Sequence, residues 1–312
     1  MKAKKITWLI PFILGLASAR GQDIPVWTLT VNAIDEQARP VSNATVKVWY
    51  HVAPLPDQAI AFTNISGQTD GSGVFMVTQR SGSIEAMCEV SKASYYSAGF
   101  THEFGKFDKS DPGRLRPVVT LLLKKINNPV PMFAKRVRDI PSEVDKQAGY
   151  DFERGDWVSP YGKGTKTDIV FTVHRERRAD DDWDYRLVVT FPKPGDGIQP
   201  FSISDLEKTS ALRSPHEAPQ NGYQSEWIKS QSRRPGQPSV YTIDKNLNFY
   251  FRVRTVLDEN GNVKSACYGK IYGDLMDFTY YLNPVVNDLN LEFNPRSNLL
   301  KNSQSFERVN AP

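Results

Sequence analysis

Short runs that alternate between apolar and polar residues are the main pattern along this chain. The odd positions are apolar in residues 169–173, and the same is true from Trp183 to Phe191 and from Leu247 to Val253. A period of two predicts β-strands with one buried face. Asn260-Gly261, which follows the third run, is the strongest hairpin signal in the chain. The pattern therefore predicts a mainly β protein.

The first third of the chain carries further short strands rich in Val, Thr and aromatic residues. Trp27–Val31, Ala44–Trp49 and Val74–Val77 are examples, and Thr69-Asp70-Gly71-Ser72-Gly73 supplies a tight turn before the last of them. Several short strands at close spacing favour two sheets packed face to face. We therefore expect a β-sandwich over residues 26–124.

Three motifs in this region carry a resemblance to a known family. They are Val31-x-Ala33-x-Asp35, Pro40-Val41-Ser42-Asn43-Ala44-Thr45-Val46 and Thr69-Asp70-x-x-Gly73-x-Phe75. Together they resemble the carboxypeptidase regulatory-like group of prealbumin-like, immunoglobulin-like β-sandwiches. The resemblance implies a non-catalytic accessory module on secreted proteins, and it does not imply peptidase activity.

Changes in composition divide the rest of the chain. Residues 125–149 combine Asn, Pro and charged residues and are predicted as a linker after a first domain at 20–124. Strand patterns resume in 150–298, where we expect a second, larger β-sandwich or jelly-roll-like domain. Its last part resembles an uncharacterised domain of secreted bacterial proteins. Residues 299–312 are predicted as a loose polar tail.

Residues 1–19 have the order of a secretory signal peptide. Lys2, Lys4 and Lys5 precede an apolar stretch from Ile6 to Leu16, and Ala17-Ser18-Ala19 follows. This stretch is too short to cross a bilayer as a helix, and later apolar runs are only as long as strands. We therefore expect an exported protein, periplasmic or extracellular, without a transmembrane segment after signal cleavage.

Charge gives no support for a nucleic-acid partner. The chain has 39 basic and 35 acidic residues, and three of the basic ones lie in the signal segment. The exported chain is therefore close to neutral, which leaves no basic surface of the kind that binds a phosphate backbone.

Common catalytic motifs do not occur in the sequence. Neither His102-Glu103 nor His216-Glu217 has a second histidine at the zincin spacing, and there is no Gly-x-Ser-x-Gly motif. A glycosidase needs only two carboxylates at the right separation. The eligible acids are Asp156, Asp168, Asp184, Glu226, Asp274 and Asp277. No residue is assigned as catalytic.

Aromatic residues in irregular segments are candidates for a ligand platform, because Trp and Tyr rings can stack on sugar rings. The candidates are Trp157, Tyr161, Tyr223 and Trp227. Trp183 and Tyr185, by contrast, share a face with Leu187 and are assigned to the core.

Two further features concern metal binding and covalent structure. An acidic cluster lies between the first two alternating runs and consists of Asp180, Asp181, Asp182 and Asp184. Calcium prefers clustered oxygen ligands, so a calcium site is one interpretation and a solvated hairpin tip is the other; no other cofactor is expected. Cys88 and Cys267 could form a disulfide after export or remain as two buried free thiols.

These observations favour a secreted, non-catalytic binding or structural protein of the cell envelope or extracellular space. Its partner would be an envelope protein or a polysaccharide. Two alternatives stay open: a carbohydrate-binding accessory protein that uses the aromatic platform, and a glycan-active hydrolase that uses paired carboxylates.

Overall fold

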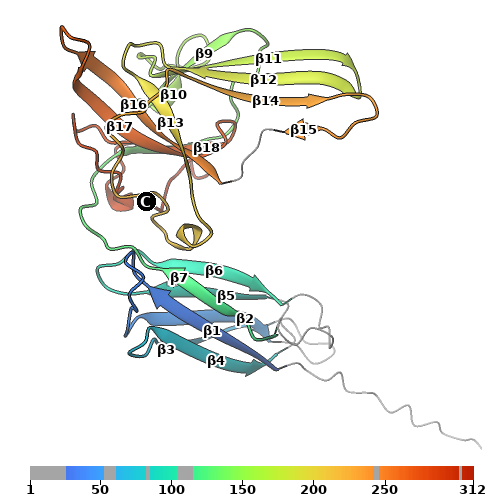
Figure 1. Ribbon diagram of the computed structural model, residues 1–312, viewed down its shortest axis with the longest axis vertical. Helices are drawn as coiled ribbons and strands as arrows, with labels where there is room; N and C mark the ends of the chain where they lie inside the picture. The colour runs from blue at the N-terminus through green and yellow to red at the C-terminus, as the bar shows by residue number, and fades with distance from the viewer. Residues whose placement is uncertain (1–25, 53–60, 82–84, 105–114, 242–245, 302–303) are drawn as a thin grey trace, which may run out of the picture.

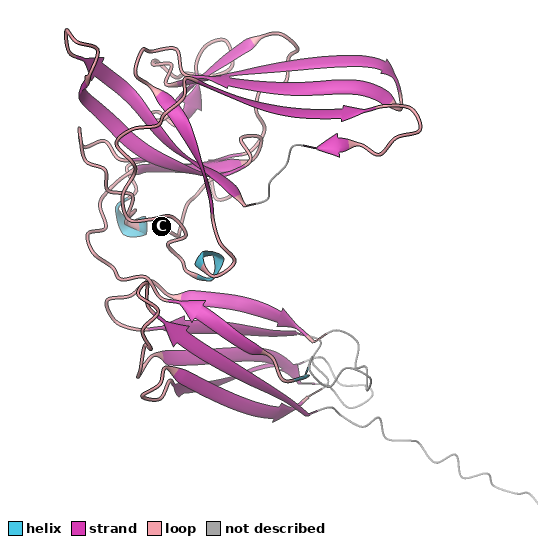
Figure 2. Ribbon diagram, in the orientation of Figure 1, coloured by secondary structure: helices cyan, strands magenta, loops and turns pink. Residues whose placement is uncertain are grey.

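The architecture was examined in a computed structural model that describes residues 26–52, 61–81, 85–104, 115–241, 246–301 and 304–312. The predicted signal peptide, residues 1–19, lies outside these ranges. Strands make up nearly all of the regular structure (Figure 2), which confirms the predicted mainly β class. In the part of the chain that is described, no helix has the length and hydropathy needed to span a membrane.

The N-terminal unit is a sandwich of two sheets, with strand orders β4-β1-β7 and β3-β2-β5-β6 (Figure 1). Its strands are β1 (Val26–Ile34), β2 (Thr45–Val52), β3 (Ala61–Gln68), β4 (Val74–Arg80), β5 (Glu85–Ser91), β6 (Ala98–Glu103) and β7 (Val118–Leu122). Alternate side chains of each strand point inward, so Trp27, Val48 and Leu121 from the two sheets meet in one core. This arrangement is the sandwich that the sequence predicts.

The C-terminal unit is a second and larger sandwich, with sheets of order β10-β9-β11-β12-β14-β15 and β13-β16-β17-β18-β8. Its strands are β8 (Phe133–Val137), β9 (Gln147–Asp151), β10 (Asp156–Trp157), β11 (Ile169–Ala179), β12 (Asp182–Thr190), β13 (Gly197–Ser202), β14 (Glu226–Arg233), β15 (Val240–Tyr241), β16 (Leu247–Leu257), β17 (Val263–Gly273) and β18 (Phe278–Leu282). Phe171 and Leu187 from the first sheet pack with Phe249, Phe251 and Ile271 from the second.

The alternation in β16 predicts one buried face and one exposed face, and only the buried face is as predicted. Phe249, Phe251 and Val253 are fully buried in the core between the sheets. The opposite face of the five-stranded sheet is also covered, so that Tyr250 and Arg252 are each only 8% exposed. Loops and the C-terminal segment provide this cover, which gives the unit a partial third layer.

The C-terminal segment packs against β8 and is not the loose tail that its composition predicts. The N–H of Arg136 donates to the carbonyl of Glu307 at 2.9 Å, and Lys135 pairs with the carboxylate of Glu307. Val309 is 8% exposed and joins an apolar cluster on the sheet's outer face. One buried apolar residue and one half-buried ion pair therefore help to hold a segment that is otherwise polar.

Strand β8 lies inside the segment that the sequence predicts as a linker. It pairs antiparallel with β18 along five residues, from Phe133 opposite Leu282 to Val137 opposite Phe278. The alternation rule missed this strand because it is short and carries Lys135 and Arg136 at its centre. Part of residues 125–149 therefore belongs to the second sandwich, and the division of the chain at 124 and 150 stays a prediction.

A loop of the second sandwich, residues 203–217, docks on the first sandwich. Ser210 bridges to Ala98, and the N–H of Ala211 donates to the carbonyl of Ser97 at 2.8 Å. The buried Lys124 amine donates to the carbonyl of Ser214 at 3.0 Å. These contacts connect the edge of the first sandwich directly to the second.

A buried carboxylate strengthens this junction. Glu292, only 2% exposed, accepts hydrogen bonds from the Tyr96 hydroxyl at 2.8 Å and from the backbone N–H of Asn127 at 3.0 Å. His216 places Nδ1 at 2.8 Å from Glu292 and Nε2 at 3.1 Å from Glu36. His216 therefore lies between two carboxylates, Glu36 from the first sandwich and Glu292 from the second.

Candidate functional site

The two sheets of the second sandwich do not cover each other completely. The covering sheet ends at the turn between β17 and β18, where Asp274 accepts from the Lys229 amine at 2.6 Å. Strands β11, β12 and β14 continue beyond this turn as an arm (Figure 1). We call residues 174–179, 182–185 and 231–233 of these strands the overhang.

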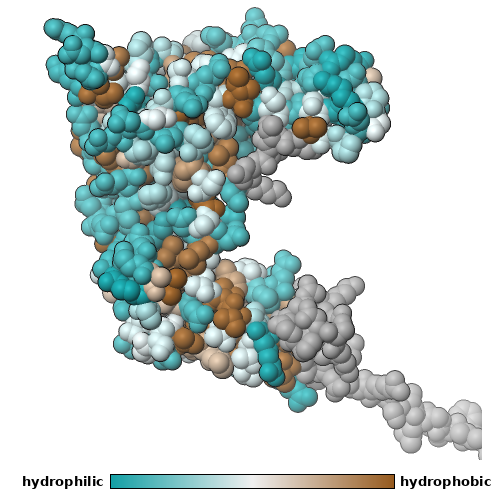
Figure 3. Space-filling view, viewed as in Figure 1, coloured by the Kyte–Doolittle hydropathy of each residue, from teal (hydrophilic) through white to brown (hydrophobic). Residues whose placement is uncertain are grey.

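The burial pattern along β11 shows where the covering sheet ends. Ile169, Phe171 and Val173 are buried, whereas Arg175 and Arg177, which follow on the same face, are exposed. The same face therefore changes from an apolar core to an accessible polar surface within one strand. In the space-filling view, the arm borders an open bay between the two sandwiches, and its end is mostly hydrophilic (Figure 3).

A cavity of about 400 Å³ lies on this face of the overhang. Half-buried Trp183 lines it, together with Gln231 on the neighbouring strand and Met276 in the covering turn. Register places Trp183 opposite Arg177 and Tyr185 opposite Arg175. The cavity thus has a sheet as its floor and the end of the second sheet as its inner wall.

The side chains of the cavity combine an aromatic surface with fixed polar donors. The Arg175 guanidinium lies over the Tyr185 ring, 5.4 Å from its centroid. The Tyr185 hydroxyl oxygen is 3.9 Å from the Met276 sulfur, which holds the ring against the covering turn. A half-buried indole beside guanidinium and amide groups can contact an apolar ring face and hydrogen-bond its substituents.

The four aromatic residues predicted as a platform are distributed over separate places. Trp157 packs edge-on against Tyr150 and Phe171, and Trp227 packs edge-on against Phe249, so both support the main core.

The two tyrosines of the predicted platform are also separated from each other. Tyr223 belongs to another cluster, where the Arg252 guanidinium lies 4.8 Å from its ring centroid. Tyr161 contacts Glu143. Among the described residues, no ring contact joins any two of these four side chains, and Trp157 and Trp227 lie on strands rather than in loops.

The acidic cluster at the hairpin between β11 and β12 is neutralised by arginines. Arg178 pairs with Asp182 and Asp184, Arg234 also pairs with Asp184, and Arg177 pairs with Asp180. No group of three or more potential metal ligands occurs within the described ranges. Guanidinium groups thus contact the carboxylates of Asp180, Asp182 and Asp184, and the calcium interpretation stays a prediction.

The carboxylates considered for glycoside hydrolysis are engaged in other contacts. Asp168 forms a bidentate pair with Arg254, and Asp277 pairs with Arg136. Burial would raise the pKa of Asp274, but the hydrogen bond from Lys229 lowers it below its usual range. A general acid of a glycosidase needs the opposite shift.

The remaining members of this set show no paired arrangement. Asp156 accepts from backbone N–H groups of Trp157 and Lys163, and Asp184 pairs with Arg178 as described above. Glu226 lies exposed at the start of β14. The contacts of the described residues therefore do not favour the hydrolase alternative.

Both cysteines are buried free thiols in different cores. Cys88 lies in the core of the first sandwich and Cys267 in that of the second, so of the two alternatives the structure has the pair of buried free thiols. Burial raises the pKa of Cys88 to about 12 and also raises that of Cys267. Neither thiol is therefore disposed to act as a nucleophile near neutral pH.

Comparisons with known proteins give only distant likenesses. No family model and no curated protein match the chain. Among solved structures, 3-chlorocatechol 1,2-dioxygenase from Rhodococcus opacus is 8% identical over 32% of this chain and 60% of that chain, with a TM-score of 0.25. The present chain thus spans less than two thirds of that enzyme.

Two other solved structures match over longer stretches. The shaft pilin SpaA from Lactobacillus rhamnosus GG is 12% identical over 55% of this chain and 90% of that chain, with a TM-score of 0.25. A Bacteroides uniformis protein assigned to carbohydrate binding is 11% identical over 84% and 98%, with a TM-score of 0.19. Likenesses this distant carry no argument about function, and the carboxypeptidase regulatory-like resemblance stays a prediction.

The sequence predicts Trp183 as a core residue, and it does pack against the main core, but it is only half-buried and also lines the cavity of the overhang. The alternation correctly showed that Trp183 shares a face with Leu187, but it could not show where the covering sheet ends. One signal was available: after Val173 the same face of β11 continues with Arg175 and Arg177. Arg175 and Arg177, which lie opposite Tyr185 and Trp183, indicate that this end of the strand extends beyond the core.

Proposed function

We propose that this chain is an exported, non-catalytic binding protein that uses the overhang to bind carbohydrate. The observation that supports this proposal most is the cavity at Trp183, where a half-buried indole stands beside Gln231 and the guanidinium groups of Arg175 and Arg177. Export rests on the signal-like sequence of residues 1–19.

Carbohydrate is the ligand class that this chemistry suits best. A sugar ring offers an apolar C–H face and a rim of hydroxyl groups, so it needs an aromatic surface flanked by planar donors and acceptors. Trp183 offers the ring, Gln231 offers an amide and Arg175 offers a guanidinium held over Tyr185. The open bay beside the arm leaves room for a chain of sugars rather than for a single small molecule (Figure 3).

The non-catalytic part of the proposal rests on the carboxylates. Asp184, the acid from the glycosidase set that lines this cavity, pairs with both Arg178 and Arg234. Among the described residues, no second acid of that set lines the cavity, whereas a glycosidase needs two carboxylates that face the same bond.

The proposal predicts that Trp183→Ala abolishes glycan binding without unfolding the protein. The test is affinity electrophoresis of the chain from residue 20 in gels that contain soluble polysaccharides, with pull-downs on insoluble ones. We expect at least a roughly tenfold loss of affinity, because a stacking ring and its buried apolar area are removed. Phe306→Ala is the matched control, since Phe306 is an aromatic residue that is 48% exposed away from the cavity.

Two results would argue against carbohydrate binding at the overhang. One is unchanged retention of Trp183→Ala on a glycan that the parent chain binds. The other is retention of the parent chain only on protein fractions of the envelope, which would favour a structural or protein-binding role.

A further inference from the structure

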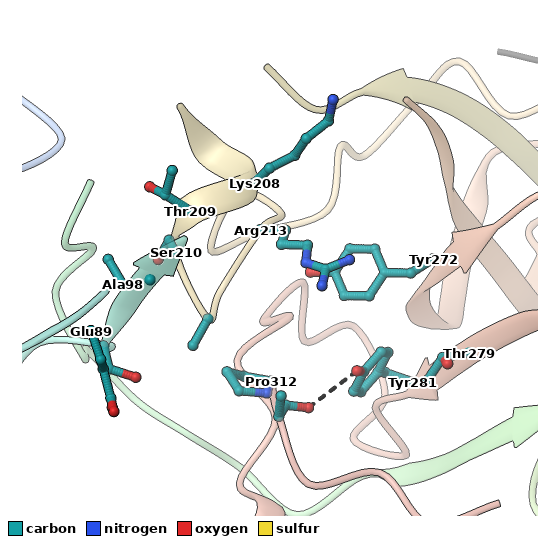
Figure 4. Close-up of a pocket in the computed structure, with 14 residues that line it drawn as sticks. Glu89, Ala98, Lys208, Thr209, Ser210, Arg213, Tyr272, Thr279, Tyr281 and Pro312 are labelled. Atoms are coloured by element: carbon teal, nitrogen blue, oxygen red, sulfur yellow. Dashed lines mark hydrogen bonds between the residues drawn. The ribbon is translucent and has the colours of Figure 1, made fainter. Parts of the chain in front are cut away.

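A second cavity, of about 390 Å³, lies at the junction of the two sandwiches, away from the overhang. The first sandwich contributes Ser97 and Gly99 to its lining, and the second contributes Ser210, Arg213, Tyr272 and Tyr281. In the close-up, Ser210 lies on one side and Arg213, stacked on Tyr272, lies on the other (Figure 4). A ligand here would contact both sandwiches.

Ser210 presents a buried hydroxyl that has no partner. The residue is 2% exposed, and its Oγ forms no hydrogen bond with any residue that the structure describes. Its backbone is fixed by the bridge to Ala98, and the residue is part of the cavity lining. Leaving a buried hydroxyl unsatisfied is unfavourable, which points to a group that fills this position.

Arg213 is a cation without an acidic partner. Its side chain is exposed, its guanidinium lies 5.9 Å from the centroid of the Tyr272 ring, and within the described ranges it pairs with no carboxylate. Glu89 is an acid that lines the cavity, and it lies on the Ser210 side, across from Arg213 (Figure 4). Stacking fixes the guanidinium fork in a position from which it can bind an oxyanion in a bidentate manner.

Arg213 is the cation of this cavity that can attract a negatively charged ligand. Lys208, which also lines the cavity, pairs with Asp205, and the buried Lys124 pairs with Glu207 at 3.4 Å. An exposed guanidinium without a carboxylate partner attracts an anion.

Lys270 lies behind Tyr272 and Tyr281, with its amine 5.0 and 4.8 Å from the two ring centroids. Burial lowers the pKa of Lys270 well below its usual value, so we assign it no positive charge in the folded protein.

We propose that the junction cavity binds a small oxyanion, a carboxylate or phosphate group, between the guanidinium of Arg213 and the hydroxyl of Ser210. The oxyanion would accept two hydrogen bonds from Arg213 and one from Ser210. Because both sandwiches line the cavity, the bound anion would stabilise their relative position.

The test titrates inorganic phosphate and, separately, acetate into the chain at constant ionic strength, with calorimetry and thermal unfolding as readouts. We expect one saturable site and a melting temperature that rises with the concentration of at least one of the two probes; their relative affinities identify which oxyanion is preferred. Arg213→Gln should abolish binding, and Ser210→Ala should weaken it about tenfold, the loss of one hydrogen bond to a charged group.

Arg296→Gln serves as the matched control because Arg296 is an exposed arginine distant from the cavity lining. It should leave the titration unchanged, as should Trp183→Ala, which separates this proposal from carbohydrate binding. Absence of saturable binding with both probes would overturn the proposal. Equal binding by the parent chain and Arg213→Gln would overturn it as well.

Discussion

The pKa of Lys270 depends strongly on the surroundings of its amine. Its side chain is fully buried, its amine donates to the Ser214 hydroxyl at 3.0 Å, and within the described ranges it pairs with no carboxylate. Burial lowers the pKa of Lys270 well below its usual value of 10.5, and the nearby Lys124 lowers it further. The folded protein therefore favours a neutral amine at a position where the unfolded chain carries a charge.

This residue makes stability depend on pH in a predictable direction. Between the lowered folded pKa of Lys270 and 10.5, the unfolded chain binds one more proton, so the free energy of unfolding rises with pH by about 1.4 kcal/mol per pH unit. Lys270→Met removes this dependence. We expect the variant to gain most over the parent chain near neutral pH and to lose that advantage as the pH approaches 10.5.

Urea unfolding at pH 7, 8 and 9 measures the effect. Lys264→Met, an exposed lysine on the same strand, is the matched control and should follow the parent chain at every pH. A constant difference between Lys270→Met and the parent chain would show that Lys270 keeps its charge in the folded state.

At the scale of elements, the C-terminal segment protects a sheet edge. Strand β8 is the last strand of the five-stranded sheet, and an unpaired edge can pair with other chains. Asn298 and Glu307 occupy this edge: the Asn298 amide exchanges hydrogen bonds with the backbone of Ala134, and the Glu307 carbonyl accepts from Arg136. The segment thus acts as irregular cover for β8.

The contribution of this segment can be measured with Val309→Ala. Removal of two buried methyl groups should cost roughly 1.5 kcal/mol in the free energy of unfolding and should accelerate hydrogen exchange at the amide of Arg136. Val286→Ala, at a residue that is 55% exposed, should change neither quantity. Unchanged exchange at Arg136 in Val309→Ala would mean that the polar contacts of Asn298 and Glu307 hold the segment without Val309.

Element by element, periodicity predicted the strands well and their partners poorly. The alternating runs that become β11, β12, β16 and the turn at Asn260-Gly261 follow directly from the sequence, because each reflects local geometry. Pairing of β8 with β18 depends on residues far apart in the chain, and the overhang depends on where another sheet ends. Neither the pairing of β8 nor the overhang could therefore be predicted from the sequence alone.

At the scale of the whole molecule, the buried carboxylate of Glu292 links the two sandwiches. Glu292→Gln would keep the shape of the side chain but remove the charge that Tyr96, Asn127 and His216 surround. We expect a loss of about 1–3 kcal/mol at the junction. Differential scanning calorimetry should then show two separate unfolding transitions where the parent chain shows one.

Glu226→Gln, an exposed acid on β14, is the control for this experiment and should keep a single transition. A single transition in Glu292→Gln would show that the docked loop, through Ser210, Ala211 and Lys124, is sufficient to couple the sandwiches.

The pairing of β8 with β18 also has a consequence for biosynthesis. Strand β8 is the first strand of the second sandwich to leave the ribosome, and its sheet partner β18 is the last. During synthesis, the backbone of β8 stays without its β18 partner until nearly all of that sandwich has emerged from the ribosome. Such non-local pairing is slow and leaves strands open to aggregation. The first sandwich can fold early, whereas the second depends on holding factors until its final strand arrives.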